Sequence, residues 1–184
     1  KIFIERIGGS RMSLILVMNK PYNDDKALEN VIKYVINGME DGAIRYASSE
    51  DCICYGVNPL SPQTIINSFN MDKRIYNKEN GKQVHHFVLT IYKKNYLGMQ
   101  NKKDWASLLC NEVSYYLRTK GFRNIACIHV AYEGNVHIHF AVNSVNGFTG
   151  KKLINEKYFY NDLIHYLRLN YNILKWEKVV YKKW

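Results

Sequence analysis

Proline, cysteine and long apolar runs are all scarce in this sequence of 184 residues. With 3 Pro and 11 Gly, it is neither collagen-like nor a proline-rich linker. No apolar run approaches the roughly 18 residues that a transmembrane helix needs. The 4 cysteines lack the two Cys pairs typical of a zinc site. Cys52 and Cys54 share one face of a predicted strand, which disfavours a disulfide between them, so we expect reduced, buried thiols.

The residues that are abundant point to a folded protein with an anionic partner. Apolar residues make up 47% of the chain and aromatic residues 14%, far more than in disordered chains. The 26 Lys and Arg against 16 Asp and Glu give a net charge of +10, which indicates nucleic acid or an anionic membrane as partner. Residues 1–11 end in Gly-Gly-Ser-Arg before Met12 and are predicted to be a tag remnant or an N-terminal extension. Residues 12–184 are predicted to be a single domain.

Periodicity predicts alternating strands and helices followed by a strand pair. The expected strands are 13–18, 52–57, 84–92, 125–132, 136–144 and 175–184. The expected helices are one with its cap and acidic first turn at 23–25 that runs to about 36, one that opens at Ser61-Pro62, 104–120 and 156–169. Because 125–132 and 136–144 are adjacent strands joined by a short turn, the sheet cannot be all parallel. We therefore predict an α+β fold, with an antiparallel sheet and helices mainly on one face.

A His-x-His motif carries the chemistry of the sequence. Residues two apart in a strand share a face, so His137, His139 and Asn143 point the same way. Whether His129 on the preceding strand joins them depends on the strand register. A two-residue turn at 134–135 would place His129 opposite Phe140, on the wrong face, whereas a three-residue turn at 133–135 would place it opposite His139. We predict the odd-length turn, or a bulge that gives the same register.

Three imidazoles with open coordination positions are typical of a catalytic metal site. The competing interpretation is a pair of histidines exposed on a polar sheet face, because short motifs often occur by chance. Three of the six histidines fall between positions 129 and 139, which favours a metal site. The basic charge favours it further.

These residues resemble those of a known family. The motif His137-Ile138-His139, with Asn143 and the segment 146–152 (NGFTGKK), is similar to the third motif of plasmid mobilisation relaxases, which are HUH endonucleases. The closest subgroup is the MobP-type relaxases, whose first and second motifs resemble 31–36 (VIKYVI) and 84–90 (VHHFVLT). The helix that follows the metal motif resembles 161–168, so the resemblance spans about 12–176. One departure is Ala131, where the family usually has Asp, and the nearest acid is Glu133.

The resemblance implies a DNA strand transferase, a relaxase nuclease domain over 12–184 with a palm-like, ferredoxin-like fold. It implies that Tyr34 attacks single-stranded DNA at a transfer-origin hairpin, forming a 5′-phosphotyrosyl bond with the help of Mn²⁺ or Mg²⁺. It also implies a bacterial cytoplasmic location. The partners that it implies are accessory mobilisation proteins and a secretion coupling protein, and no membrane is implied as a partner. The residues assigned are Tyr34 as nucleophile; His129, His137 and His139 as metal ligands; His86, Asn143 and Glu133 in supporting roles; and Lys33, Arg74, Lys151 and Lys152 along the DNA backbone.

Other interpretations of these tyrosines and histidines compete with a relaxase. On a helical wheel Tyr34 lies on the flank of the apolar stripe, a position typical of a boundary packing residue. In other HUH enzymes, the rolling-circle replication initiators and transposases, the nucleophile follows the histidine motif, which makes Tyr160 the main competitor. Two further alternatives are a non-catalytic domain that binds single-stranded nucleic acid and a structural metal protein.

Overall fold

The computed structural model describes residues 13–18, 20–37, 44–45, 52–54, 61–92, 95, 102–130 and 135–181. The predicted tag remnant or extension at 1–11 lies outside the described residues, as do Ala131 and Glu133. In the described part of the chain no helix has the length and apolarity to span a membrane.

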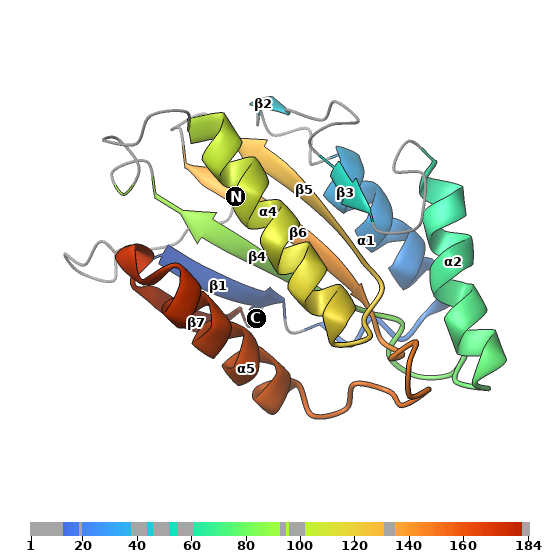
Figure 1. Ribbon diagram of the computed structural model, residues 1–184. Helices are drawn as coiled ribbons and strands as arrows, with labels where there is room; N and C mark the ends of the chain where they lie inside the picture. Colours follow the sequence, from blue (N-terminus) through green and yellow to red (C-terminus); the bar gives the residue numbers. More distant parts are fainter. Residues whose placement is uncertain are drawn as a thin grey trace.

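The described strands form one twisted sheet (Figure 1). They are β1 (Ser13–Met18), β2 (Ile44–Arg45), β3 (Cys52–Cys54), β4 (Val84–Ile91), β5 (Asn124–Val130), β6 (Val136–Asn143) and β7 (Trp176–Tyr181). Their order is β2-β5-β6-β4-β1-β7, with β3 also paired to β5. All described pairs are antiparallel except β1 with β7. The predicted α+β class and antiparallel sheet are confirmed.

The longer helices are divided between the two faces of the sheet. They are α1 (Asp25–Asn37), α2 (Pro62–Ile75), α4 (Lys102–Thr119) and α5 (Glu156–Asn170), and a short 3₁₀ turn, η1 (Asn172–Leu174), precedes β7. Helices α4 and α5 pack on one face, whereas α1 and α2 pack on the other (Figure 1). The expectation of helices mainly on one face is therefore wrong in this detail. The physical reason is that every residue of β4 is buried, so both faces need an apolar cover.

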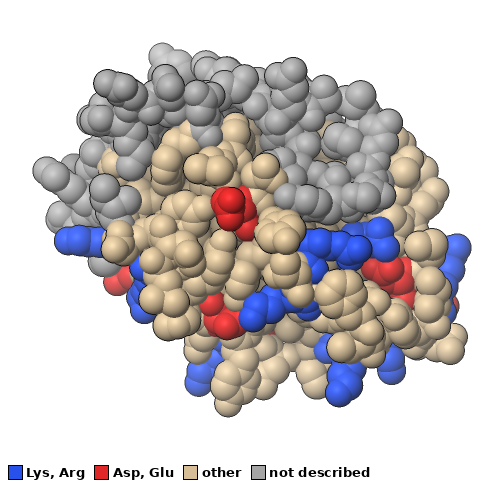
Figure 2. Space-filling model, in the orientation of Figure 1, with Lys and Arg blue, Asp and Glu red and all other residues tan. Residues whose placement is uncertain are grey.

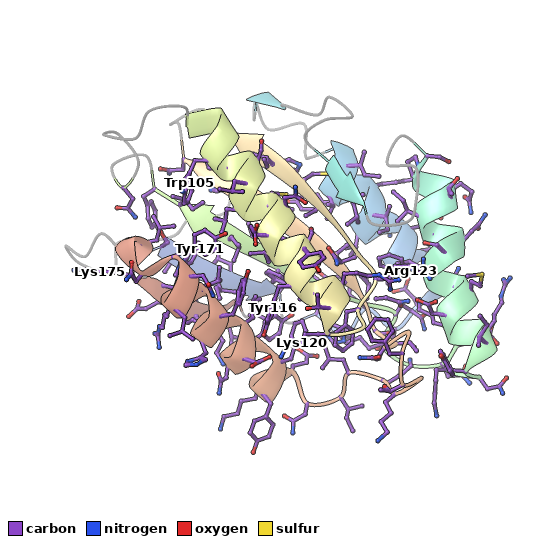
Figure 3. All side chains as sticks on the ribbon, viewed as in Figure 1. Trp105, Tyr116, Lys120, Arg123, Tyr171 and Lys175 are labelled. Carbon is purple, nitrogen blue, oxygen red and sulfur yellow. The ribbon has the colours of Figure 1, made fainter. Side chains whose placement is uncertain are left out.

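The face covered by α4 and α5 holds the larger apolar core. It contains Phe87, Ile138 and Phe140 from the sheet, together with Leu109 and Leu117 from α4 and Leu163 and Leu167 from α5. At the rim of this core, Tyr116 of α4 stacks on Tyr166 of α5, with their ring centroids 4.0 Å apart, and the Tyr116 hydroxyl donates to Asp162 (Figure 3). These contacts join the two helices.

The second core lies between α1, α2 and the opposite face. Helix α1 buries the predicted stripe of Leu28, Val31, Ile32 and Val35, which packs against α2 and against β5 and β6. Helix α2 begins as predicted, because Ser61 Oγ accepts a hydrogen bond from Thr64 N (3.3 Å) and Pro62 occupies the first helical turn.

One cysteine contradicts the expectation of reduced thiols. Cys127 on β5 is disulfide-bonded, and Cys52 on β3 lies directly opposite it in the strand register. Directly opposed residues of an antiparallel pair have neighbouring Cβ atoms. Sequence spacing alone cannot show this neighbour, since the two positions are 75 residues apart in the chain.

A buried polar network fastens α2 to the sheet. Asp72 accepts two hydrogen bonds from Arg123, from Nε (3.0 Å) and Nη2 (3.1 Å), and a third from Asn143 Nδ2 (3.1 Å). Arg123 follows α4 and reaches α2 (Figure 3). Asn143 Nδ2 also donates to the Phe69 carbonyl (3.1 Å). The bidentate pair of Arg123 and Asp72 has a specific geometry, which the further hydrogen bond from Asn143 reinforces. This network therefore fixes the packing of α2 against β6.

We expect Asp72→Ala to destabilise the protein by about 3 kcal/mol, because it leaves the partly buried Arg123 guanidinium without its carboxylate and removes one of the two acceptors of the buried Asn143 amide. Urea unfolding followed by circular dichroism measures this loss. The control is Arg74→Ala, which removes an exposed ion pair with Glu79 at 3.5 Å and should cost less than about 1 kcal/mol. Equal effects of the two substitutions would show that the network does not hold α2 in place.

Candidate active site

The register of β5 and β6 decides which histidines face one another. His129 lies opposite His137, and Cys127 lies opposite His139. The predicted face is therefore confirmed, whereas the predicted pairing of His129 with His139 is wrong by two residues. Five residues, 131–135, separate the paired Val130 and Val136. Lengthening an odd connection from three to five residues shifts the pairing by two positions but leaves every side chain on the same face.

Four imidazoles gather on this face, and we call them the histidine cluster: His86, His129, His137 and His139. The His139 ring lies in the middle, with its centroid 4.4 Å from that of His129, 5.7 Å from His86 and 6.2 Å from His137. His86 comes from β4, where it pairs with Ala141. Its neighbour His85 faces the other way, toward Glu156 of α5, so only one residue of this His-His pair joins the cluster.

Burial favours the uncharged form of His86, His137 and His139. Burial first, and then Lys20 and His129, lower the pKa of His86 to about 3. Burial first, and then His129, lower the pKa of His137 to about 4. The pKa of His139 is held well below its ordinary value by burial and then by the other three histidines. A neutral imidazole keeps one nitrogen lone pair, which is the form that binds a metal ion.

A hydrogen bond from the cluster fixes the last turn of α1. His129 Nε2 lies 2.8 Å from the Val35 carbonyl oxygen. Because a carbonyl can only accept, Nε2 must carry a proton, so in the neutral ring the lone pair is on Nδ1. Carbonyls in the last turn of a helix lack a donor within the helix, so the bond also supplies a partner that α1 cannot provide. It anchors the helix turn directly beside position 34.

Tyr34 lies against the cluster. Its half-buried ring meets His139 edge-on, with centroids 5.3 Å apart, and meets His86 in the same way at 5.5 Å. The flank position on the helical wheel therefore has a specific use: it turns the ring past the apolar stripe and onto the imidazoles. Tyr34 is the one tyrosine of α1, and its ring contacts two imidazoles of the cluster.

The competing tyrosine lies on the opposite side of the sheet. Tyr160 of α5 is buried against Phe87 and Phe159, with ring centroids 5.8 and 5.1 Å away. Phe87 projects from the face of β4 opposite to that of its neighbour His86. Burial raises the pKa of the Tyr160 hydroxyl, which opposes its ionisation. The structure does not bring Tyr160 to the histidine cluster.

The histidine cluster and Tyr34 fall within the match to a protein family. The family described as "Relaxase: MobA/VirD2-like, nuclease domain" matches residues 34–168. The chain belongs to this relaxase family. Its role is that of a DNA-nicking relaxase domain, and the matched segment runs from Tyr34 through the whole histidine cluster to α5. No curated protein and no solved structure matches the chain.

Other residues predicted for the relaxase site lie away from the cluster. Asn143 is four positions beyond His139 on β6 and belongs to the Asp72 network, so its amide holds α2. Lys33 is exposed beside Tyr34 and pairs with Glu29. The other basic residues lie around the loop after α2: Arg74 pairs with Glu79, Lys152 donates to the carbonyls of Asn80 and Lys82, and Lys151 is exposed.

One described face of the relaxase domain carries charges of both signs (Figure 2). On the face drawn in Figure 2, Lys and Arg side chains are scattered over the described surface and interleaved with Asp and Glu. No single large basic patch is seen on the described part of this face. Of the basic residues predicted to follow the DNA, Lys33 is the one adjacent in sequence to Tyr34.

Two residues at the cluster were missed by the sequence analysis. Tyr22, in the loop before α1, places its hydroxyl 3.5 Å from His86 Nδ1, and burial raises the pKa of this hydroxyl to about 12. Thr90 on β4 lies opposite His137, and its buried hydroxyl has no hydrogen-bond partner in the described part of the chain. Thr90 could have been found, since it is four positions after His86 and so shares its face. No sequence pattern pointed to Tyr22.

The residues of the cluster fit a divalent metal ion in their chemistry. Hydrogen bonding leaves Nδ1 of His129 with its lone pair, and His139 uses Nδ1 toward His86 (3.4 Å), so its Nε2 is directed elsewhere. Among the residues described, no three His, Cys, Asp or Glu side chains stand as a ready group of ligands.

Proposed function

We propose that this relaxase domain nicks single-stranded DNA at a transfer origin during conjugative mobilisation, with Tyr34 as the nucleophile. The observation that carries the proposal is the edge-on contact of Tyr34 with His139 and His86, at 5.3 and 5.5 Å between centroids. A tyrosine hydroxyl is a weak nucleophile unless a base or a metal-bound phosphate lies beside it. The histidine cluster provides such a neighbourhood, and no comparable neighbourhood surrounds Tyr160 in the described structure.

The proposed reaction is a transesterification. The Tyr34 oxygen forms a bond to phosphorus while the bond from phosphorus to the 3′ oxygen breaks. The phenolic proton leaves and the 3′ oxygen gains a proton, so the products are a 5′-phosphotyrosyl link and a free 3′-hydroxyl. One phosphate ester replaces another, and the strand can be rejoined by the reverse reaction.

His129, His137 and His139 are the residues that would hold a divalent ion, Mn²⁺ or Mg²⁺ in this proposal. When bound, such an ion polarises a phosphate oxygen and stabilises the charge that develops in the transition state. The hydrogen bond between His129 and Val35 would tie the position of Tyr34 to that of the ion. Lys33, next to Tyr34, is placed to pair with a DNA phosphate in exchange for Glu29.

The proposal extends to the setting of the reaction. We infer a MobP-type relaxase of the bacterial cytoplasm that works with accessory mobilisation proteins and a secretion coupling protein. The first and second motifs described in the sequence support the subgroup. The net charge of +10 supports a polyanionic substrate.

Covalent capture of DNA tests the proposed function. The protein is incubated with single-stranded oligonucleotides that tile both strands of the DNA flanking its gene, with Mn²⁺ and with or without EDTA. We expect one oligonucleotide to give an adduct that survives SDS, and EDTA to abolish it. Binding to the oligonucleotides without any adduct would favour the non-catalytic alternative and contradict the proposal.

A further inference from the structure

Tyr22 contacts the histidine cluster but has no part in the proposed reaction. Its hydroxyl lies 3.5 Å from His86 Nδ1, and His86 Nε2 lies 3.4 Å from His139 Nδ1. Three side chains from three segments, the loop before α1, β4 and β6, thus form one line of polar contacts. That line ends on the central imidazole of the cluster.

The backbone of Tyr22 is held in an unusual conformation. Its φ angle is +47°, in the left-handed region that bulky residues rarely adopt. The Tyr22 carbonyl accepts a hydrogen bond from Gln83 N (2.8 Å), and the Gln83 side chain accepts another from the buried Lys73 Nζ (2.9 Å). An uncommon backbone conformation that its surroundings hold in place often marks a functional site. Here it directs the Tyr22 hydroxyl toward His86.

The hydrogen bonds along this line can run in either of two directions, because each imidazole can place its proton on either ring nitrogen. A neutral imidazole has one N–H and one lone pair. If Tyr22 donates to His86 Nδ1, then His86 Nε2–H donates to His139, whose own proton is left on Nε2 and blocks ligation there. If Tyr22 accepts from His86 Nδ1–H, then His139 Nδ1–H donates to His86, and the lone pair of His139 is on Nε2. The Tyr22 hydroxyl can donate or accept a hydrogen bond, so it is compatible with both arrangements.

We propose that Tyr22 is a positioning residue which, acting through His86, holds His139 in the tautomer whose Nε2 lone pair can bind a divalent metal ion. This inference rests on the metal site of the proposed function. Metal-binding histidines commonly donate their second N–H to a fixed acceptor, which sets both the tautomer and the ring orientation. For His129 that acceptor is the Val35 carbonyl. For His139 it is His86, which in turn needs Tyr22 as its own acceptor.

Metal affinity of the Tyr22→Phe variant tests the inference without any DNA. Titration calorimetry with Mn²⁺ should show a dissociation constant about tenfold higher than that of the unaltered protein, the lower end of the effect of partners that orient metal ligands. The control is Tyr76→Phe, which removes a hydroxyl that donates to the Gly147 carbonyl (2.9 Å), a hydrogen bond that involves no residue of the cluster. It should lower stability but leave Mn²⁺ affinity unchanged.

Nitrogen-15 NMR of the imidazoles reads the tautomers directly. In the unaltered protein loaded with diamagnetic Zn²⁺, we expect the proton of His139 on Nδ1 and that of His86 on Nδ1. In Tyr22→Phe the His86 signals should show a mixture of tautomers. A His139 proton on Nε2 in the loaded protein overturns the inference even if the variant does not fold.

The outcomes separate the inference from the proposed function. If the unaltered protein binds Mn²⁺ and Tyr22→Phe binds it equally well with the same tautomers, only the role of Tyr22 is overturned. If the unaltered protein binds no Mn²⁺ at all, the proposed metal site and this inference both fail.

Discussion

Tyr34→Phe should abolish formation of the covalent adduct, with a loss of more than about 10⁴-fold, the scale seen when a nucleophile is removed from an enzyme. The substitution removes one oxygen and keeps the ring. The edge contacts with His139 and His86 therefore persist, and the fold and DNA affinity should change little. Single-turnover assays with a labelled oligonucleotide measure the adduct, and thermal unfolding checks the fold.

The matched control is Tyr160→Phe. Tyr160 lies on the other face of the sheet, packed against Phe87 and Phe159, so its variant should form the adduct at close to the normal rate. The reverse pattern, with the adduct lost in Tyr160→Phe and kept in Tyr34→Phe, would contradict the site and favour the arrangement of rolling-circle initiators and transposases.

The second large effect is expected from His137→Ala. His137 is half-buried, and its removal leaves the His129–Val35 and His86–His139 hydrogen bonds in place. The fold should therefore survive while one of three proposed ligands is lost. We expect Mn²⁺ affinity to fall by about 100-fold and nicking by about 10³-fold, because a bound ion supplies several kcal/mol of transition-state stabilisation.

His165→Ala is the control for this prediction. His165 is exposed on α5, away from the cluster, and its loss should alter neither Mn²⁺ affinity nor nicking. Nicking that persists in His137→Ala at the normal rate, or that is equally fast with and without EDTA, would contradict a role for the cluster in holding a metal ion.

Much of the site could be predicted because period-2 alternation in strands is rigid. It places His137 and His139 on one face, and it puts the adjacent His85 and His86 on opposite faces. An odd-length connection placed His129 on the same face as well. The predicted partner of His129 on β6 is wrong by two residues. The face on which His129 lies depends only on whether the connection has an odd or even number of residues, whereas its partner depends on the actual length of the connection.

Other features depend on tertiary neighbours that no local pattern contains. Asn143 shares a face with the histidines, but α2 lies over that end of β6 and Asp72 engages its amide. Tyr22 reaches His86 from a loop through a left-handed backbone conformation. The division of helices between two faces follows from the burial of β4 on both sides, which becomes evident only once the sheet is assembled.

The most direct test of the central claim is to find which tyrosine carries the DNA. After adduct formation and nuclease trimming, tryptic peptides are analysed by mass spectrometry. The peptide that ends at Arg45 contains Tyr34 as its sole tyrosine, whereas 158–168 contains Tyr158, Tyr160 and Tyr166. We expect a nucleotide phosphate on the peptide ending at Arg45. A nucleotide on 158–168, or on any peptide without Tyr34, would contradict the central claim.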